Sequence, residues 1–272
     1  MSEVPNVTLT GGMAIPQVGF GVYQVPPAET ERTVLAAIEA GYRSIDTAKL
    51  YRNEREVGRA VSHSGLPREE LFVTTKLWND DHGYGPALTA FERSRRELGL
   101  DYVDLYLIHW PAHSADRYVQ TWRAFEKLLS DGVVRAIGVS NFEQVHLRGL
   151  VNQTQTVPSI SQIELHPRQP QAQLRAFHAE LGIATEAWAP LARGPLLPDR
   201  TVTELARKYG KTPAQIVLRW HLQLGNIVIP KSVTPSRIRE NIDLFDFELA
   251  EDDMAVIDGL GPGGDADILE DR

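Results

Sequence analysis

Three ionisable residues each end a short apolar strand in the amino-terminal half of the chain: Asp46, Lys76 and His109. Tyr51 stands five residues after Asp46, in the loop that follows the first of these strands. Ionisable groups rarely end buried strands unless they are paired or functional. If the strands are parallel neighbours, the four side chains converge at one edge of the sheet. This pattern predicts a reaction site.

These four residues suit the protonation of an oxygen atom. A free tyrosine titrates near pH ~10 and is a poor proton donor to a developing alkoxide unless its surroundings adjust it. The ammonium of Lys76 would lower the pKa of Tyr51, and Asp46 would keep that ammonium charged and oriented. His109 can donate a hydrogen bond that fixes a carbonyl oxygen. None of the four supplies a hydride, so a cofactor must deliver the electrons.

Two other interpretations of the same residues remain open. A strand-end Asp–Lys pair is more often a satisfied ion pair than a catalytic one, and a single buried His is similar. Four such groups at consecutive strand ends shift the balance toward chemistry. The second alternative is a Schiff base formed by Lys76, as in barrel aldolases.

Short apolar strands alternate with helical periodicity along most of the chain. Eight strands are predicted, at residues 18–21, 44–46, 72–76, 104–109, 136–140, 160–164, 184–188 and 227–230. A hairpin that turns at Gly11-Gly12 precedes them. A helix is predicted over 249–259, followed by a polar tail from residue 261. Strands that alternate with helices form a parallel sheet covered by helices.

The fold class expected is α/β, a (β/α)8 TIM barrel in a single domain over residues 1–272. A length of 272 residues is ordinary for such a barrel. The G-x-G-x-x-G fingerprint of an open dinucleotide-binding sheet does not follow the first strand. The amino-terminal hairpin is expected to close the bottom of the barrel, and extra helices complete the fold. Catalytic groups of such barrels come from the carboxyl ends of different strands.

Composition excludes several classes of function. The chain carries 28 Lys and Arg against 36 Asp and Glu, a formal charge of −8, which disfavours nucleic acid or an anionic membrane as partner. It has no cysteine, so disulfides, thiolate metal sites and thiol catalysis are excluded, and no metal site is predicted. No signal peptide or membrane span is recognisable. We expect a cytoplasmic protein that acts on a small molecule as a monomer.

A second functional signal follows the last predicted strand. Residues 231–237 leave that strand and open a helix, with Thr234 as N-cap and Pro235 at the first position. Free N–H groups, the helix dipole, Lys231 and Arg237 together predict an anion site. Loops after the last two strands of barrels commonly bind phosphate. A basic helix start on its own is usually a solvated face.

Three tryptophans, Trp78, Trp110 and Trp188, lie at or just past strand ends. Trp188 could stack on a flat ring, whereas Trp78 and Trp110 would wall a pocket. The structural alternative is that these aromatic side chains cap the barrel core.

Several ordered motifs resemble those of the aldo-keto reductase family. They are the segments 46–54 (DTAKLYRNE), 75–78 (TKLW), 105–111 (LYLIHWP), 138–142 (GVSNF), 162–167 (QIELHP) and 231–237 (KSVTPSR). The resemblance extends from the hairpin to about residue 260. Within the family, segments 25–28, 75–80 and 210–215 are most similar to bacterial 2,5-diketo-D-gluconic acid reductases.

The resemblance implies an NADPH-dependent reductase that converts aldehydes and ketones to alcohols, with keto-sugar acids and α-dicarbonyls among the possible substrates. It implies that Tyr51 is the general acid, that Lys76 and Asp46 tune it, and that His109 orients the carbonyl. Ser140, Asn141 and Gln162 would hold the nicotinamide carboxamide, with Trp188 stacked on the ring and Gly21, Val22 and Leu191 also at the cofactor. Lys231, Ser232, Val233 and Arg237 would bind the adenosine 2′-phosphate, and Glu240 and Asn241 the adenine side. Tyr23, Lys49, Trp78 and Trp110 would line the substrate pocket.

Two points stay open at the level of sequence. Lys49 could favour acidic or sugar-acid substrates, or it could simply point to solvent. The protein could also be a non-catalytic NADPH-binding sensor or regulatory protein on the same fold, which would bind the cofactor and turn over negligibly.

Overall fold

The computed structural model describes residues 4–112 and 115–261. Most of the tail predicted from residue 261 and part of the loop after His109 therefore lie outside the described residues. No helix in the described ranges is long and apolar enough to cross a membrane.

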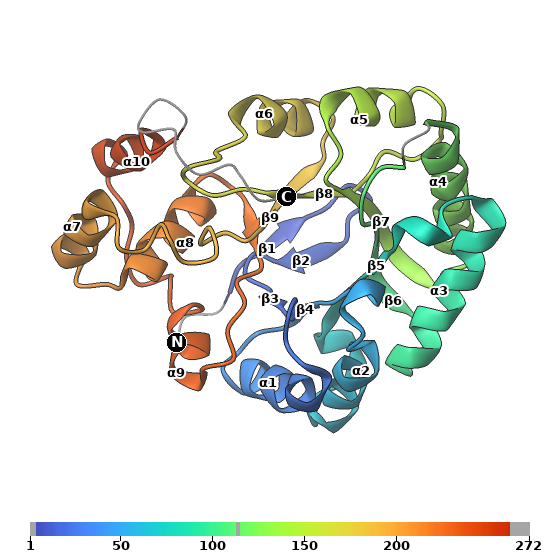
Figure 1. Cartoon of the computed structure of the whole chain (residues 1–272), viewed down its shortest axis with the longest axis horizontal. Coiled ribbons are helices and arrows are strands. Elements are labelled where there is room, and N and C mark those ends of the chain that lie inside the picture. The colour runs from blue at the N-terminus through green and yellow to red at the C-terminus, as the bar shows by residue number, and fades with distance from the viewer. Residues whose placement is uncertain (1–3, 113–114, 262–272) are drawn as a thin grey trace.

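Eight parallel strands follow one another around the molecule in their order along the chain. Helices surround them on the outside (Figure 1). The strands are β3 (Phe20–Gly21), β4 (Ser44–Asp46), β5 (Phe72–Leu77), β6 (Val103–Ile108), β7 (Val134–Ser140), β8 (Ile160–Glu164), β9 (Ala184–Trp188) and β10 (Ile227–Val228). All eight predicted strands are present. Their ends differ from the prediction by up to two residues, so that Leu77 ends β5 and His109 lies just beyond β6.

The first and last strands of the sheet meet and close the barrel. Val18 forms a parallel bridge with Val228. The N–H of Gly19 donates to the carbonyl oxygen of Val228 at 2.8 Å, and the N–H of Val228 donates to the carbonyl oxygen of Gln17 at 3.0 Å. The predicted closure into a (β/α)8 barrel is confirmed.

Gly21 lies where the chain after β10 approaches the end of β3 closely. Its N–H donates to the carbonyl oxygen of Pro230 at 3.2 Å. A Cβ atom at position 21 would come within 3.0 Å of the carbonyl oxygen of Ile229. This close approach of two backbones explains why glycine stands at the end of β3.

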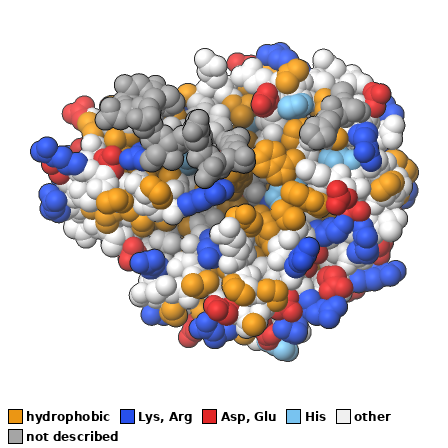
Figure 2. All heavy atoms as spheres, viewed as in Figure 1, with side chains coloured by type: hydrophobic (Ala, Val, Ile, Leu, Met, Phe, Trp, Pro, Cys, Tyr) orange, Lys and Arg blue, Asp and Glu red, His pale blue; other side chains and the backbone are white. Residues whose placement is uncertain are grey.

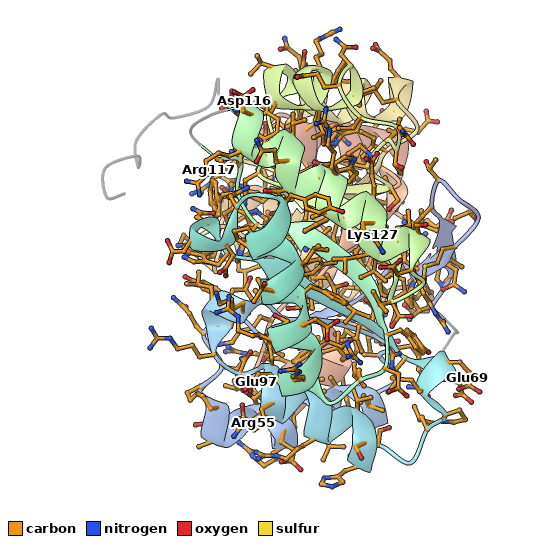
Figure 3. All side chains as sticks on the ribbon, turned by 90° about the vertical axis from the view of Figure 1, so that its right-hand side faces the viewer. Arg55, Glu69, Glu97, Asp116, Arg117 and Lys127 are labelled. Carbon is orange, nitrogen blue, oxygen red and sulfur yellow. The ribbon has the colours of Figure 1, made fainter. Side chains whose placement is uncertain are left out.

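The helices that cover the sheet bury apolar stripes and expose charged faces. They are α1 (Pro27–Glu39), α2 (Glu54–His63), α3 (Tyr84–Leu98), α4 (Ala115–Ser130), α5 (Gln144–Val151), α6 (Ala172–Glu180), α7 (Arg200–Tyr209), α8 (Pro213–Gln223), α9 (Pro235–Glu240) and α10 (Glu251–Asp258), with short 3₁₀ turns η1 (Lys49–Tyr51), η2 (Arg68–Glu70) and η3 (Asn79–Asp81). Thr212 and Gln215 form a capping box at the start of α8. On the outer faces, Arg55 of α2 pairs with Glu97 of α3 at 2.9 Å (Figure 3).

The amino-terminal hairpin, β1 (Asn6–Thr8) and β2 (Ala14–Pro16), lies against the amino-terminal ends of the barrel strands. Leu9 and Ile15 of the hairpin are buried in one cluster with Phe72 and Ile160, which begin β5 and β8. The hairpin thus covers the bottom of the barrel, as predicted, and leaves the carboxyl ends of the strands for the site.

Candidate active site

The four side chains predicted from strand ends meet inside the barrel. Nζ of Lys76 lies 2.6 Å from Oδ1 of Asp46 and donates to the carbonyl oxygen of Thr47 at 3.0 Å. It also lies 3.4 Å from Oη of Tyr51. The rings of Tyr51 and His109 are 5.8 Å apart, at 79° to each other. Parallel neighbours β4, β5 and β6 place these groups together because their carboxyl ends share one edge.

Lys76 is fully buried and charged. Burial works against its positive charge, but the neighbouring Asp46 and Tyr51 outweigh that cost and raise the pKa of Lys76 above its ordinary value. A Schiff base requires a neutral amine as nucleophile. The buried ion pair therefore argues against aldolase chemistry at Lys76.

The phenol of Tyr51 is a weaker acid than the sequence suggests, because its pKa is raised. Burial raises the pKa of its phenol, and Lys76 lowers it only in part, so the net shift is upward. The expected lowering by the ammonium of Lys76 is present, but the desolvation of the phenolate, which the sequence does not show, is larger. Tyr51 consequently keeps its proton through neutral pH and is available as a donor.

His109 is held as a neutral imidazole. Burial, and next the positive charge of Lys76, lower the pKa of His109 to about 3. Its Nδ1 is buried and has no hydrogen-bond partner within the described residues. A neutral ring carries one N–H, which can donate to a carbonyl oxygen without placing a second positive charge beside Lys76.

Asn141 joins His109 to Trp188. Its Oδ1 accepts from Nε1 of Trp188 at 2.9 Å, and its Nδ2 donates to the carbonyl oxygen of His109 at 3.0 Å and to Oγ of Ser140 at 3.0 Å. Asn141 adopts a left-handed backbone conformation, with φ of 61°, which asparagine tolerates better than most residues. Ser140 is buried beside it at the end of β7.

Gln162 links two buried carboxylates. Its Nε2 donates to Oδ2 of Asp46 at 2.9 Å and to Oε2 of Glu186 at 2.7 Å. Glu186, which was not among the residues predicted from the sequence, is 1% exposed in the middle of β9. The available signal was an ionisable residue inside a strand, two positions before Trp188 and therefore on the same face.

Aromatic rings form the entrance above the ionisable groups. The ring of Trp78 lies 5.2 Å from that of His109, and the ring of Tyr23 lies 5.1 Å from that of Tyr51. Tyr23 and Trp110 are among the exposed large hydrophobic side chains. Three of the four residues assigned to the substrate pocket are therefore aromatic and stand at the mouth of the barrel.

The fourth, Lys49, forms an ion pair with Asp81 of η3. Asp81 also pairs with Arg93 of α3 at 2.7 Å. Neither alternative left open by the sequence describes Lys49 fully, because its charge is compensated by a carboxylate within the protein.

The residues assigned to the adenosine end lie after β10 and in α9. Lys231 and Arg237 are exposed, and neither forms an ion pair with a carboxylate of the described chain. Oγ of Ser232 accepts from the N–H of Thr234 at 3.1 Å, whereas the side chain of Thr234, the predicted N-cap, does not cap the helix. Oε1 of Glu240 accepts from Oγ1 of Thr212 at 2.7 Å.

The remaining residues assigned to the cofactor differ in how deeply they are buried. Val22 and Asn241 are buried, and Leu191 and Val233 are half-buried. The carbonyl oxygen of Val22 accepts from Nδ2 of Asn53 at 3.1 Å, which fixes the loop after β3 to the start of α2.

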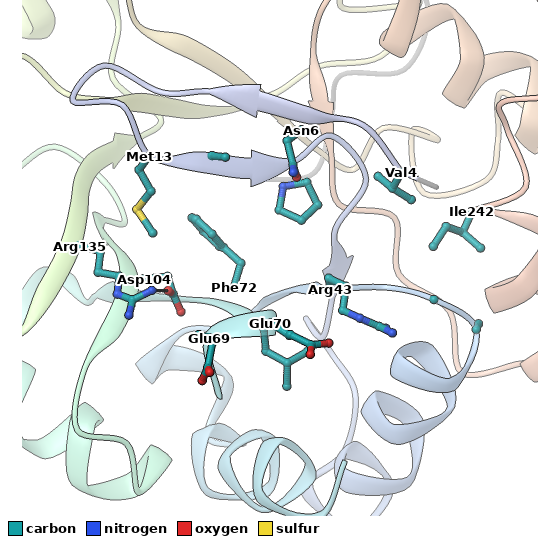
Figure 4. A pocket seen from close by; sticks show the side chains of 15 residues that line it. Val4, Asn6, Met13, Arg43, Glu69, Glu70, Phe72, Asp104, Arg135 and Ile242 are labelled. Carbon is teal, nitrogen blue, oxygen red and sulfur yellow. Dashed lines mark ion pairs between the residues drawn. The ribbon is translucent and has the colours of Figure 1, made fainter. Parts of the chain in front are cut away.

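Two cavities lie at opposite ends of the barrel. One, of about 590 Å³, is bordered by Trp110, Asn141 and Trp188 at the carboxyl ends of the strands. Another, of about 730 Å³, lies under the hairpin, where Asp104 pairs with Arg135 (Figure 4). The smaller cavity is the better candidate because it lies at the carboxyl ends of the strands, where Asn141, which borders it, donates to the carbonyl oxygen of His109. On the face shown in Figure 2, hydrophobic side chains gather around a central hollow.

These features fit a nicotinamide cofactor at the carboxyl ends of the strands. The exposed cations Lys231 and Arg237 lack carboxylate partners in the described ranges, which suits a phosphate. The cavity beside Trp188 suits a flat ring. Within the same ranges, no group of three or more His, Asp or Glu side chains is arranged to hold a metal ion.

The chain belongs to the aldo/keto reductase family, whose model matches residues 9–262. It is 57% identical over 259 residues to an aldo-keto reductase of Mycolicibacterium smegmatis, covering 95% of this chain and 94% of the relative. It is 51% identical to a glyoxal reductase of Bacillus subtilis, with coverage of 94% and 92%. It is also 49% identical to the methylglyoxal reductase DkgA of Escherichia coli, with coverage of 97% and 96%.

Solved structures agree with this assignment. An aldo/keto reductase of Brucella melitensis superposes with a TM-score of 0.94 at 52% identity, covering 96% of this chain and 99% of the other. A variant of Gox0644 in complex with NADPH superposes with a TM-score of 0.92 at 46% identity, with coverage of 96% and 95%.

Proposed function

We propose that this protein is an NADPH-dependent reductase of small aldehydes and ketones. The observation that carries the proposal is the buried Asp46–Lys76 ion pair with Oη of Tyr51 3.4 Å from the ammonium. Family membership and the NADPH complex of Gox0644 support the choice of cofactor. A bound nicotinamide cofactor would supply the hydride that none of these side chains can provide.

Tyr51 would donate its proton to the carbonyl oxygen as that oxygen gains negative charge. Lys76 is held as an ammonium by Asp46, so it would stabilise the phenolate left behind. His109, neutral at physiological pH, would donate a hydrogen bond to the same oxygen and fix its position. Trp78 and Tyr23 border these two donors and would exclude water from the reacting carbonyl.

At the cofactor, Gln162, Ser140 and Asn141 would face the carboxamide, and Trp188 would stack on the ring. Lys231 and Arg237, with Ser232 and Val233 beside them, would pair with the 2′-phosphate. Because only NADPH carries that phosphate, these cations favour NADPH over NADH. Glu240 and Asn241 would lie on the adenine side.

The substrates that we propose are uncharged α-dicarbonyls rather than keto-sugar acids. Lys49, the cation assigned to the substrate pocket, already pairs with Asp81 and offers little attraction to a carboxylate. The aromatic entrance suits small apolar carbonyl compounds. The relatives named glyoxal reductase and methylglyoxal reductase point in the same direction.

The test is NADPH oxidation by the native protein and by Tyr51→Phe with methylglyoxal, phenylglyoxal and a keto-sugar acid, repeated with NADH. We expect turnover with NADPH to fall by two or more orders of magnitude in Tyr51→Phe, while NADPH binding, followed by tryptophan fluorescence, is retained. Tight NADPH binding without turnover of any carbonyl would support a non-catalytic sensor instead. Absence of NADPH binding would refute the proposal.

A further inference from the structure

The side-chain amide of Gln162 is fixed in one orientation by two carboxylates. Its Nε2 carries two hydrogens. This nitrogen donates to Oδ2 of Asp46 at 2.9 Å and to Oε2 of Glu186 at 2.7 Å. While both carboxylates are ionised they accept hydrogen bonds and do not donate them, so the amide nitrogen, and not the oxygen, faces them. Oε1 of Gln162 is therefore turned away from both and is free to accept a hydrogen bond from another group.

Glu186 is a buried carboxylate without an ion-pair partner in the described part of the chain. Lys76 makes its direct contact with Asp46, whereas the polar contact of Glu186 is the amide of Gln162. A buried carboxylate that lacks a cation destabilises the fold unless it takes up a proton. A group kept at such a cost is a candidate for a functional role.

The position of Glu186 relates it to the proposed cofactor site. It stands two residues before Trp188 on β9, so both side chains leave the same face of the strand. Gln162, its hydrogen-bond partner, is one of the residues proposed to face the carboxamide. Glu186 thus contacts Gln162, which we propose faces the carboxamide, and shares a strand face with Trp188, which we propose stacks on the nicotinamide ring.

We propose that Glu186 is a positioning residue for the nicotinamide end of the cofactor, which fixes the amide of Gln162 and favours the oxidised ring by its negative charge. This inference rests on the proposed NADPH-dependent function. The oxidised ring is cationic and the reduced ring is neutral, so only the oxidised form gains from a nearby carboxylate. In a buried site such an attraction is weakly screened.

Protonation of Glu186 would switch this preference near neutrality. Burial and the neighbouring Asp46 raise its pKa to about 7. The charged groups that act on it are Asp46 from β4, which raises the pKa, and Lys76 from β5, which lowers it. The carboxylate is ionised above that pH and neutral below it.

Two variants separate the charge from the hydrogen bond. Glu186→Gln keeps an oxygen that can accept from Gln162 but removes the charge, whereas Glu186→Met removes both. Glu180→Gln, at an exposed position that ends α6, is the matched control for a lost surface charge. Dissociation constants are measured for NADP⁺, NADPH and adenosine 2′,5′-bisphosphate, above and below pH about 7. The bisphosphate lacks nicotinamide and reports whether the adenosine site is intact.

Above that pH, we expect Glu186→Gln to weaken NADP⁺ binding about tenfold and to leave NADPH within about twofold of the native value. Glu186→Met should weaken NADPH about tenfold as well, because Gln162 loses its orientation. Bisphosphate binding should stay unchanged in both. In the native protein the ratio of NADPH to NADP⁺ dissociation constants should fall as pH drops, and in Glu186→Gln it should be constant.

Three results are decisive. Unchanged NADP⁺ binding in Glu186→Gln and unchanged NADPH binding in Glu186→Met would overturn the inference. Equal weakening of all three ligands would also overturn it, since that would indicate a general structural role. If the native protein binds the bisphosphate and both nucleotides no better than unrelated anions, the proposed function itself fails.

Discussion

Lys49 and Asp81 form an ion pair at the edge of the aromatic entrance, between η1 and η3. The side chain of Lys49 is 32% exposed and that of Asp81 14% exposed, so the carboxylate side of the pair is shielded from water. The pair joins the loop that carries Tyr51 to the loop after β5. It neutralises the cation that the sequence placed in the substrate pocket.

Release of Lys49 should change substrate preference. We expect Asp81→Asn to raise kcat/KM for a keto-sugar acid several-fold relative to methylglyoxal, because the freed ammonium can attract the substrate carboxylate. Arg93 loses its partner in the same variant, so the double variant Asp81→Asn/Lys49→Met is the control. Only if Lys49 is responsible will the gain disappear in the double variant.

Replacement of Lys76 should affect stability and turnover separately. Lys76→Met leaves Asp46 buried without its cation, which should reduce the free energy of unfolding by about 3–5 kcal/mol. The double variant Asp46→Asn/Lys76→Met should recover most of that loss in urea unfolding. It should remain inactive, because Tyr51 would lack the ammonium. Recovery of turnover in the double variant would contradict the role given to Lys76.

His109 should stay neutral over the whole working range of pH. Its pKa is lowered from 6.5 to about 3, so the folded state takes up no proton here until strongly acid pH, whereas the unfolded chain does so near 6.5. The stability associated with the neutral ring is thus present above the unfolded value and is lost as pH falls toward about 3. Histidine NMR titration of native protein and His109→Gln would identify the signal. A midpoint near 6.5 would contradict the neutral donor.

Glu186 should produce the opposite trend in stability. Its pKa is raised from 4.5 to about 7, so its contribution to stability is fully present below the unfolded value and is lost as pH rises through about 7. Glu186→Gln should remove that part of the pH dependence and make the protein more stable than native at alkaline pH. Thermal unfolding across this range, with Glu180→Gln alongside, measures the effect. Parallel profiles for native and Glu186→Gln would show that Glu186 titrates normally.

The hairpin should support stability without affecting the chemistry. Ile15 is fully buried at the bottom of the barrel, away from the four ionisable groups. Ile15→Ala should lower the free energy of unfolding by about 2–5 kcal/mol, because it leaves a cavity in a packed cluster. At temperatures where the variant is folded, kcat and KM should equal the native values. A selective loss of kcat would mean that the two ends of the barrel are coupled.

The sequence by itself determined the barrel and the identity of four interacting groups. Strand periodicity and the loop position of Tyr51 were enough, because the carboxyl ends of parallel strands must share one edge of a sheet. The amino-terminal hairpin was also recognisable, and so was the basic segment 231–237 after the last strand, since both depend on local turn and charge patterns. Asp46, Lys76 and His109 each stand at or next to the end of a strand, so their positions along the chain predict that their side chains meet.

Only the tertiary structure decided the balance of charge and desolvation at each group. Burial outweighs the ammonium at Tyr51, and Asp81 comes from another loop to neutralise Lys49. The hydrogen bond between Glu186 and Gln162 forms because β8 and β9 lie side by side in the sheet. Local pattern shows which residues can titrate, but pKa values and pairing depend on distances and solvent exclusion, which strands far apart in sequence create together.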